Sequence, residues 1–210
     1  MKNKRILEII RRTGALITGT HVIYTSGKHG SAYINKDAIY PHTQVISSIG
    51  KKIAVLFMKD HVQVVAAPAI GGIVLSQWVA YHLSRLTKMD VLAVYAEKEK
   101  TGSHFYFRRG YDKLISENKT LVVEDILTTG ASAKKVVEQV LKAGGKVIGV
   151  GAIFNRGKVT AKSIGVPQLR VLGDFELEAW SAKKCPLCAR NVPINLELGK
   201  GKELRNKHNS

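Results

Sequence analysis

The apolar positions of this chain follow two patterns: a recurrence typical of helices and short continuous runs typical of buried strands. From Thr43 to Phe57 they recur every three or four residues, which predicts a helix. A continuous apolar run at 62–67 predicts a short buried strand, and the small residues at 68–72 predict a tight turn. A second helix is expected from Ile73 to about Leu86, followed by a strand at 91–95.

The same order of elements returns in the second half of the chain. We expect a buried strand at 121–123, a turn of small residues at 128–132, and a helix over 133–141 that ends at the glycine pair 144–145. A further strand is expected at 146–154. Strands that alternate with helices predict an α/β fold, a Rossmann-like parallel sheet flanked by helices, with its ligand site at the carboxyl ends of the strands. Both small-residue turns follow such ends.

Three segments fall outside this pattern. Residues 1–40 contain an amphipathic helix and then an irregular stretch rich in hydroxyl groups. Residues 97–118 are charged and aromatic and too long for an ordinary connection, so we expect a mobile functional loop with a ribbon at its aromatic end. We treat the chain as one domain, with a small N-terminal hood at 1–40, an α/β core at 41–172, and a C-terminal extension with a basic tail at 173–210.

The composition fits a single globular domain with a large positive charge. The 210 residues are 45% hydrophobic and 23% charged, which excludes a disordered chain. The chain has 33 Lys and Arg residues against 16 Asp and Glu residues, a net charge of +17. A surplus of this size predicts a polyanionic partner, either nucleic acid or a small molecule that carries phosphates.

The sequence argues against membrane insertion and secretion. The most apolar stretch, 62–83, has spanning length, but polar residues, glycines and a proline interrupt it. The residues after the basic N-terminus are too charged for the core of a signal peptide. Two cysteines cannot build a disulfide framework. We therefore expect a cytoplasmic protein without a membrane partner.

The strongest chemical signal is the segment Val-Val-Glu-Asp-Ile-Leu-Thr-Thr-Gly-Ala-Ser at 122–132. Its two adjacent carboxylates, Glu124 and Asp125, can accept hydrogen bonds from a vicinal diol or help to hold a metal. Its three hydroxyl side chains, with the backbone N–H groups of a turn that enters a helix, can bind a phosphate. A diol site and a phosphate site separated by a few residues fit a ribose 5-phosphate.

Three other interpretations of such segments deserve comparison. The acidic strand of a nucleotide triphosphatase requires Gly-x-x-x-x-Gly-Lys-Ser/Thr elsewhere, and the chain contains no such segment. Gly149 and Gly151 resemble the start of a dinucleotide fingerprint, but Phe154 stands where the third glycine belongs. An ordinary strand, cap and helix is the third interpretation, and the length of the matching run disfavours it.

The segment resembles the phosphoribosyl-diphosphate (PRPP) binding motif of type I phosphoribosyltransferases: a branched apolar pair, an acidic pair, two further positions, Thr-Thr-Gly, any residue and Ser. The resemblance extends over roughly residues 15–160 and is strongest to the orotate phosphoribosyltransferase branch. It implies that the chain moves ribose 5-phosphate from PRPP to a nitrogenous base, with Mg²⁺ as cofactor and pyrophosphate as product. It also implies a homodimer in which the 97–118 loop reaches into the neighbouring site.

The resemblance assigns roles to two turns. Glu124 and Asp125 would hold the ribose hydroxyls and act in catalysis, and Asp125 would also help to hold Mg²⁺. The residues that would bind the 5-phosphate are Thr128, Thr129, Gly130, Ala131 and Ser132. The residues that would bind the pyrophosphate are Ala69, Ile70, Gly71 and Gly72, where two glycines allow the backbone to approach a charged ligand.

The 97–118 segment stands where the resemblance implies a flexible catalytic loop that closes over PRPP. The run from Tyr95 to Glu99 resembles the family's Tyr-x-Arg-Lys-Glu, with Lys98 matched and Glu97 in place of the Arg. The other cationic candidates in this loop are Lys100, His104, Arg108 and Arg109.

The resemblance also points to orotate as the base, through less specific matches near the N-terminus. Ser26, Lys28 and Tyr33 lie in a stretch similar to the family's Ser-Gly-x-x-Ser-x-x-Tyr, and would contact the base. Gly30 stands in place of the inner Ser, and Thr25 in place of the Lys that precedes the stretch.

A second match to an orotate site follows the strand at 146–154. Arg156 stands where the family has an Arg that pairs with the carboxylate of the base, a task that suits a guanidinium because it binds carboxylates bidentately. Asn155 replaces the Asp that precedes this Arg in the family. We therefore expect orotate as the acceptor.

Two alternative functions stay open. A purine or another base is the first, because Thr25 and Glu97 depart from the orotate pattern. A PRPP-sensing regulator that binds nucleic acid is the second, and it would give the basic tail at 200–210 a role. Such a regulator would not need Lys98, Lys100 and Arg109 over pyrophosphate, so an enzyme is favoured and nucleic acid is the less favoured partner.

Cys185 and Cys188 form a single Cys-x-x-Cys pair. A structural zinc site needs about four ligands, and the chain has no second cysteine pair. Reduced thiols in a loop are the first expectation, while zinc shared across a dimer or completed by a histidine stays open. His21, His29 and His42 are expected at the surface or in loops.

Overall fold

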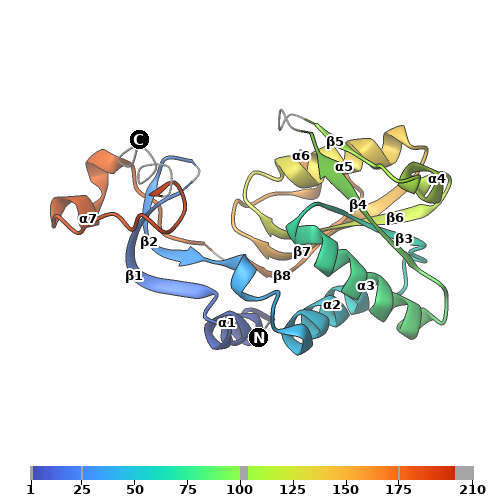
Figure 1. Ribbon diagram of the computed structural model, residues 1–210, viewed down its shortest axis with the longest axis horizontal. Helices are drawn as coiled ribbons and strands as arrows, with labels where there is room; N and C mark the ends of the chain where they lie inside the picture. The colour runs from blue at the N-terminus through green and yellow to red at the C-terminus, as the bar shows by residue number, and fades with distance from the viewer. Residues whose placement is uncertain (1, 25, 100–103, 175, 202–210) are drawn as a thin grey trace. The chain divides into compact units, whose positions relative to one another are not determined.

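The chain folds into two compact units, which we describe separately. The computed structural model describes residues 2–24, 26–99, 104–174 and 176–201 (Figure 1). The first unit, called the core unit, comprises 1–6 and 42–175. The second, called the hairpin unit, comprises 7–41 and 176–210.

A six-stranded sheet forms the centre of the core unit. Its strands are β3 (Val64–Pro68), β4 (Leu92–Lys98), β5 (Phe105–Tyr106), β6 (Lys119–Leu127), β7 (Lys146–Asn155) and β8 (Leu169–Asp174). They lie in the order β5-β4-β3-β6-β7-β8, and every neighbouring pair is parallel except β4 and β5. The prediction of an α/β fold with a mostly parallel sheet is confirmed.

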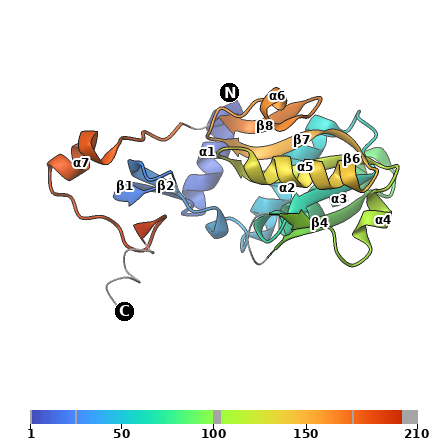
Figure 2. The same cartoon turned by 90° about the horizontal axis from the view of Figure 1, so that it is seen from above.

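Helices cover both faces of this sheet. They are α2 (Thr43–Phe57), α3 (Gly71–Thr87), α4 (Tyr111–Ile115), α5 (Ala131–Lys142) and α6 (Ala161–Ile164). Both views show α5 on one face and α2 with α3 on the other (Figures 1 and 2). No helix within the described ranges combines the length and the apolar character that a membrane crossing requires.

The alternation of side chains along the strands explains the two layers. In β3, Val64 and Ala66 belong to the apolar cluster that contains the buried residues of α5. On the other face, a Cβ placed on Gly151 of β7 would lie 3.0 Å from both Ile53 and Phe57 of α2. Successive strand residues project to opposite faces, so strands buried on both sides are apolar without interruption, as the sequence indicates.

The strand order brings the two small-residue turns to one edge of the sheet. β3 and β6 are parallel neighbours, with Val64 opposite Thr120, and β6 and β7 are parallel neighbours, with Leu127 opposite Asn155. The carboxyl ends of β3, β6 and β7 therefore meet at the same edge. This is the place where parallel α/β sheets bind ligands.

Two parts of the core unit differ from the sequence-based expectation. β4 continues to Lys98 and pairs with β5, so the expected ribbon begins inside the 97–118 segment, and α4 occupies part of its remainder. β8 was not predicted, because Arg170 interrupts its short apolar run. The Arg170 guanidinium lies 2.8 Å from the Asp60 carboxylate and 4.8 Å from the centre of the Phe57 ring, which lets an edge strand accommodate the charge.

The hairpin unit is built from the two ends of the chain. Its elements are β1 (Leu16–Ile23), β2 (His29–Ile34), two 3₁₀ turns at Lys36–Ala38 and Ala182–Lys184, and α7 (Pro186–Ala189), while α1 (Lys2–Arg12) crosses the limit between the units. β1 and β2 form an antiparallel hairpin, so the expectation of an irregular stretch from Thr20 to Tyr40 is wrong. The C-terminal extension pairs with this hairpin: His29 and Trp180 exchange two backbone hydrogen bonds of 2.8 Å. Trp180 lies far from His29 in the sequence, so local patterns could not predict this pairing.

Candidate functional site

Two buried carboxylates lie near the carboxyl end of β6. Glu124 and Asp125 are 7% and 3% exposed. The backbone N–H of Asp125 donates to Glu124 Oε1 at 3.1 Å, and the N–H of Ile126 donates to Asp125 Oδ1 at 2.7 Å. These hydrogen bonds from backbone N–H groups hold the carboxylate oxygens in place.

The turn after β6 has the geometry of an anion site. Gly130 has φ +76°, and a Cβ there would lie 2.7 Å from Ile164 and 2.9 Å from Val159, so both the backbone and the packing require glycine. Thr129 is exposed, and its hydroxyl accepts a hydrogen bond from the N–H of Ala131 at 3.3 Å. α5 begins directly after this turn, and the first N–H groups of a helix have no partner within the helix. These groups and the hydroxyls of Thr128, Thr129 and Ser132 can bind a phosphate.

The turn after β3 also leads directly into a helix. The N–H of Ala69 donates to the carbonyl of Ala96 at 2.8 Å, and the peptide bond between Ala69 and Ile70 is cis. Ile70 is 85% exposed, and α3 begins at Gly71. Adjacent strands of a sheet lie about 4.8 Å apart. The N-termini of the two helices that follow β3 and β6 are therefore close enough to contact one small molecule with two phosphate groups.

β7 ends beside the turn at 128–132, and Arg156 follows the strand directly. The N–H groups of Arg156 and Gly157 donate to the carbonyl of Leu127 at 2.8 and 3.1 Å. A Cβ at Gly157 would overlap the backbone of Thr128, so the two loops are in close contact. The structure therefore brings Arg156 to the same edge as the acidic pair and both turns.

The β4–β5 ribbon carries the cationic candidates that the structure describes. Arg109 lies 2.8 Å from Glu97, and Arg108 lies 3.8 Å from the same carboxylate. The Arg109 guanidinium also lies 6.0 Å from the centre of the Tyr95 ring, and hydrogen bonding to Glu97 raises the pKa of Arg109. The residue that departs from the family pattern, Glu97, thus holds a predicted catalytic arginine.

Two of the remaining cationic candidates of the 97–118 loop, Lys98 and His104, are exposed. Lys98 is exposed at the end of β4, which runs parallel to β3 toward the same edge. His104 is exposed, and its Nδ1 lies 3.6 Å from the carboxylate of Glu99. Lys100 lies outside the described residues, as do Thr25 and residues 202–210 of the basic tail.

The proposed base-binding residues of the N-terminal stretch lie in the hairpin unit. Ser26 and Lys28 are exposed, and the Ser26 hydroxyl accepts a hydrogen bond from the N–H of Lys28 at 3.4 Å, while Tyr33 of β2 is half-buried. The Tyr24 ring occupies the space into which a side chain at Gly30 would point. A serine would not fit there, which explains the departure from the family's Ser-Gly-x-x-Ser pattern.

Two histidines are placed differently from the sequence-based expectation. His21 and His29 are buried, with 2% and 7% exposure, so the prediction of surface or loop positions is wrong for both. Each lies on a strand of the hairpin, and residues of the C-terminal extension cover them. A single sequence gives no sign of such a long-range contact.

The sequence was compared with known families and proteins. The phosphoribosyl transferase domain family matches residues 35–168. An orotate phosphoribosyltransferase of Thermoanaerobacter sp. (strain X514) is 36% identical over 92% of this chain and 96% of its own length. One from Thermus thermophilus is 36% identical over 90% of this chain and 97% of its own, and one from Thermotoga petrophila is 36% identical over 93% and 98%.

Solved structures share the fold. The orotate phosphoribosyltransferase of Mycobacterium tuberculosis H37Rv superposes with a TM-score of 0.67 and 22% identity, covering 83% of this chain and 97% of that one. The enzyme of Francisella tularensis superposes with a TM-score of 0.59 and 18% identity, covering 97% and 98%. The family match, the relatives and the geometry of the sheet edge agree: this chain belongs to the phosphoribosyltransferase family and resembles the family's orotate phosphoribosyltransferases along nearly its whole length.

Proposed function

We propose that this protein is an orotate phosphoribosyltransferase, which converts PRPP and orotate to orotidine 5'-phosphate and pyrophosphate in pyrimidine nucleotide synthesis. The observation that carries the proposal is the meeting of a buried acidic pair and two turns that each lead into a helix at one edge of the sheet. Relatives with 36% identity over almost the whole chain carry this name, which supports orotate over other bases.

The two turns suit the two ends of PRPP. The turn at 128–132 would bind the 5-phosphate, and the turn at 69–72 would bind the pyrophosphate. Glu124 and Asp125 lie just before the first turn and would accept hydrogen bonds from the 2- and 3-hydroxyls of the ribose. The sugar would then be held at both ends and along one side, which positions C1 for attack by the base.

Charge is the second contribution of the protein. As the bond from C1 to pyrophosphate breaks, negative charge grows on the departing oxygens, and fixed cations nearby stabilise it. Lys98, Lys100, His104 and Arg109 would supply these cations from the ribbon and the loop. Arg109 pairs with Glu97 in the structure, so it would exchange this carboxylate for the pyrophosphate when PRPP binds.

The residues at the edge also fit Mg²⁺. This ion prefers carboxylate oxygens and substrate phosphates as ligands, and Asp125 is the residue that would help to hold it. When bound, Mg²⁺ would neutralise charge on the pyrophosphate. The carboxylate of Asp125 is already oriented by the N–H of Ile126.

Arg156 is our candidate for the orotate carboxylate. Guanidinium and carboxylate form paired hydrogen bonds, which would select orotate over bases without a carboxylate. Ser26, Lys28 and Tyr33 are proposed to contact the base as well.

The acceptor can be tested by measuring pyrophosphate release from PRPP and Mg²⁺ with orotate, uracil, adenine and hypoxanthine in turn. We expect release with orotate, and its loss in the Arg156→Ala variant. Release with a purine but not with orotate would contradict the proposed acceptor. If the protein binds nucleic acid in a salt-dependent way and releases no pyrophosphate from PRPP with any of these bases, the regulator would instead be favoured.

We also propose a homodimer whose 97–118 loop acts in the neighbouring site. Mixing the Lys100→Ala and Asp125→Asn variants tests it. A loop that acts across the dimer restores part of the activity, because one site in each mixed dimer then has both residues. A loop that acts within its own chain restores none.

A further inference from the structure

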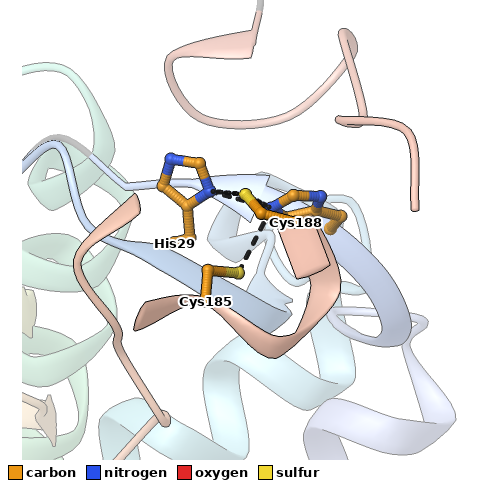
Figure 3. A group of neighbouring side chains, drawn as sticks. His29, Cys185 and Cys188 are labelled. Atoms are coloured by element: carbon orange, nitrogen blue, oxygen red, sulfur yellow. Dashed lines mark hydrogen bonds between the residues drawn. The ribbon is translucent and has the colours of Figure 1, made fainter. Parts of the chain in front are cut away.

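Four potential metal ligands meet in the hairpin unit, and none of them has a role in the proposed reaction. They are His21 of β1, His29 of β2, Cys185 immediately before α7, and Cys188 within it. Their ligand atoms all lie within 4.8 Å of one another. Figure 3 shows the side chains of His29, Cys185 and Cys188 converging. We call this group the Cys2His2 cluster.

Three sulfur-to-nitrogen distances within the cluster match a tetrahedral zinc site. Bond lengths of about 2.3 Å to sulfur and about 2.0 Å to nitrogen require ligand atoms roughly 3.3–3.8 Å apart. Cys188 Sγ lies 3.3 Å from His29 Nδ1 and 3.7 Å from His21 Nε2, and Cys185 Sγ lies 3.6 Å from His21 Nε2. The two ring nitrogens are 2.8 Å apart and would separate slightly around an ion.

The orientation of His21 is fixed by a further contact of the kind that metal-bound histidines make. Its Nδ1 lies 2.7 Å from the carbonyl oxygen of Val192. Because a carbonyl oxygen can only accept, Nδ1 carries the hydrogen and donates a hydrogen bond to this oxygen. The lone pair of Nε2 is then directed toward the two sulfur atoms. A backbone carbonyl on the far ring nitrogen fixes the tautomer and the ring plane of a metal-binding histidine.

The backbone holds the ligands together from both sides of the cysteine pair. Trp180, before the cysteines, pairs with the backbone of His29, and the N–H of Asn195, after them, donates to the carbonyl of His21 at 2.7 Å. Three of the four side chains are buried, and Cys185 is 3% exposed. Cys185 and Cys188 are free thiols, on the two-residue spacing that zinc sites use.

We propose that His21, His29, Cys185 and Cys188 bind one Zn²⁺, which fastens the C-terminal extension to the β1–β2 hairpin. Two thiolates and two imidazoles are the ligands of structural zinc, and four protein ligands leave no position for a substrate. The ion therefore has a structural role. Its presence does not depend on which base the enzyme uses.

Elemental analysis of the full-length, untagged protein, purified without chelators, tests the site. We expect about one zinc per chain, since one tetrahedral site needs all four ligands. Cys185→Ser and Cys188→Ser should lower the zinc content at least tenfold, and His29→Gln should lower it too. His61→Asn is the matched control, because His61 is exposed and outside the cluster, and it should keep the metal.

Wild-type protein provides a test that no folding defect can obscure. Replacing zinc with Co²⁺ should give the thiolate-to-cobalt absorption and the strong visible bands of a tetrahedral site, and a chelator should abolish them. Removing the metal should also make the segment 176–201 more sensitive to protease. A metal-free protein with a Cys185–Cys188 disulfide, a different metal as the bound ion, or full zinc content in the double cysteine variant would overturn the proposal. Pyrophosphate release from PRPP, measured in parallel, tests the proposed enzymatic activity independently of the zinc site.

Discussion

Asn155 uses both ends of its side-chain amide to shape the loop that starts at Arg156. Its Nδ2 donates to the carbonyl of Val159, and its Oδ1 accepts from the N–H of the same residue, both at 2.9 Å. An ionised aspartate, which the family pattern has here, can only accept. The departure at this position therefore fits the local hydrogen bonding of this chain.

Asn155→Asp should destabilise the protein. The Val159 carbonyl would lose its donor in a buried place, and an unsatisfied buried group costs about 1–3 kcal/mol. Urea unfolding should show this loss in the free energy of unfolding. Asn118→Asp is the control, because its exposed amide also donates to a carbonyl, that of Leu114, and water can replace it. Equal losses in the two variants would contradict the account.

Asp125→Asn should abolish most turnover while the protein stays folded. The amide keeps the size of the carboxylate but removes the charge that would orient the ribose hydroxyls, and a loss on the order of a hundredfold or more is expected. Steady-state rates with PRPP and orotate, together with circular dichroism, measure both properties. Asp90→Asn, at an exposed position, is the control. Near-normal turnover would remove Asp125 from the mechanism.

At the scale of elements, the β4–β5 ribbon places a carboxylate beside the proposed catalytic loop. Glu97 lies opposite Tyr106 in the ribbon and pairs with Arg109, which follows β5. Closure over PRPP would require this pair to open. In the proposed mechanism, this ion pair would therefore oppose the binding of PRPP.

Glu97→Gln should lower the KM for PRPP. An exposed ion pair is weak, so the gain should be small, at most about fivefold. Glu138→Gln, which removes the same charge from the exposed face of α5, controls for net charge. An unchanged or higher KM in Glu97→Gln would show that Arg109 does not exchange Glu97 for pyrophosphate.

The contact between α2 and α3 contains a histidine that should make stability depend on pH. His82 Nε2 lies 2.9 Å from the Ser47 hydroxyl, and its ring stacks on Trp78 at 5.9 Å. Burial lowers the pKa of His82, and nearby Lys51 lowers it further, against the opposing effect of Ser47. The folded protein thus favours neutral His82.

Because this pKa is lowered on folding, the contribution of His82 to stability is present above its ordinary value of about 6.5 and is lost as the pH falls below it. Urea unfolding at neutral pH and at about pH 5 should show a smaller decline for His82→Gln than for the wild type. His61→Asn should retain the wild-type decline. An unchanged decline in His82→Gln would contradict this origin of the pH dependence.

At the scale of the whole molecule, the sequence predicts features whose residues lie in one short segment and misses contacts between residues far apart in the chain. The helix from Thr43 and the 122–132 motif were predictable because their periods and chemistry lie within one short segment. The Glu97–Arg109 pair joins a residue of β4 to one that follows β5, and the Cys2His2 cluster joins segments near the two ends of the chain. The sequence leaves a histidine partner for the cysteines open, but only the fold identifies His21 and His29 as these partners.

The charge of +17 should act on the capture of PRPP. A positive field raises the association rate of a polyanion. Salt weakens this field, which at 0.1 M is largely screened beyond about 10 Å. The value of kcat/KM for PRPP should therefore fall with rising salt more steeply than kcat. Equal salt dependence of both constants would assign the charge another role.

The most direct test of the central claim is a crystal structure of the protein with PRPP and Mg²⁺. The account predicts the 5-phosphate at the N–H groups and hydroxyls of 128–132, the ribose hydroxyls within hydrogen-bonding distance of Glu124 or Asp125, and the pyrophosphate at 69–72. A sugar phosphate bound elsewhere, or the 5-phosphate at 69–72, would contradict it.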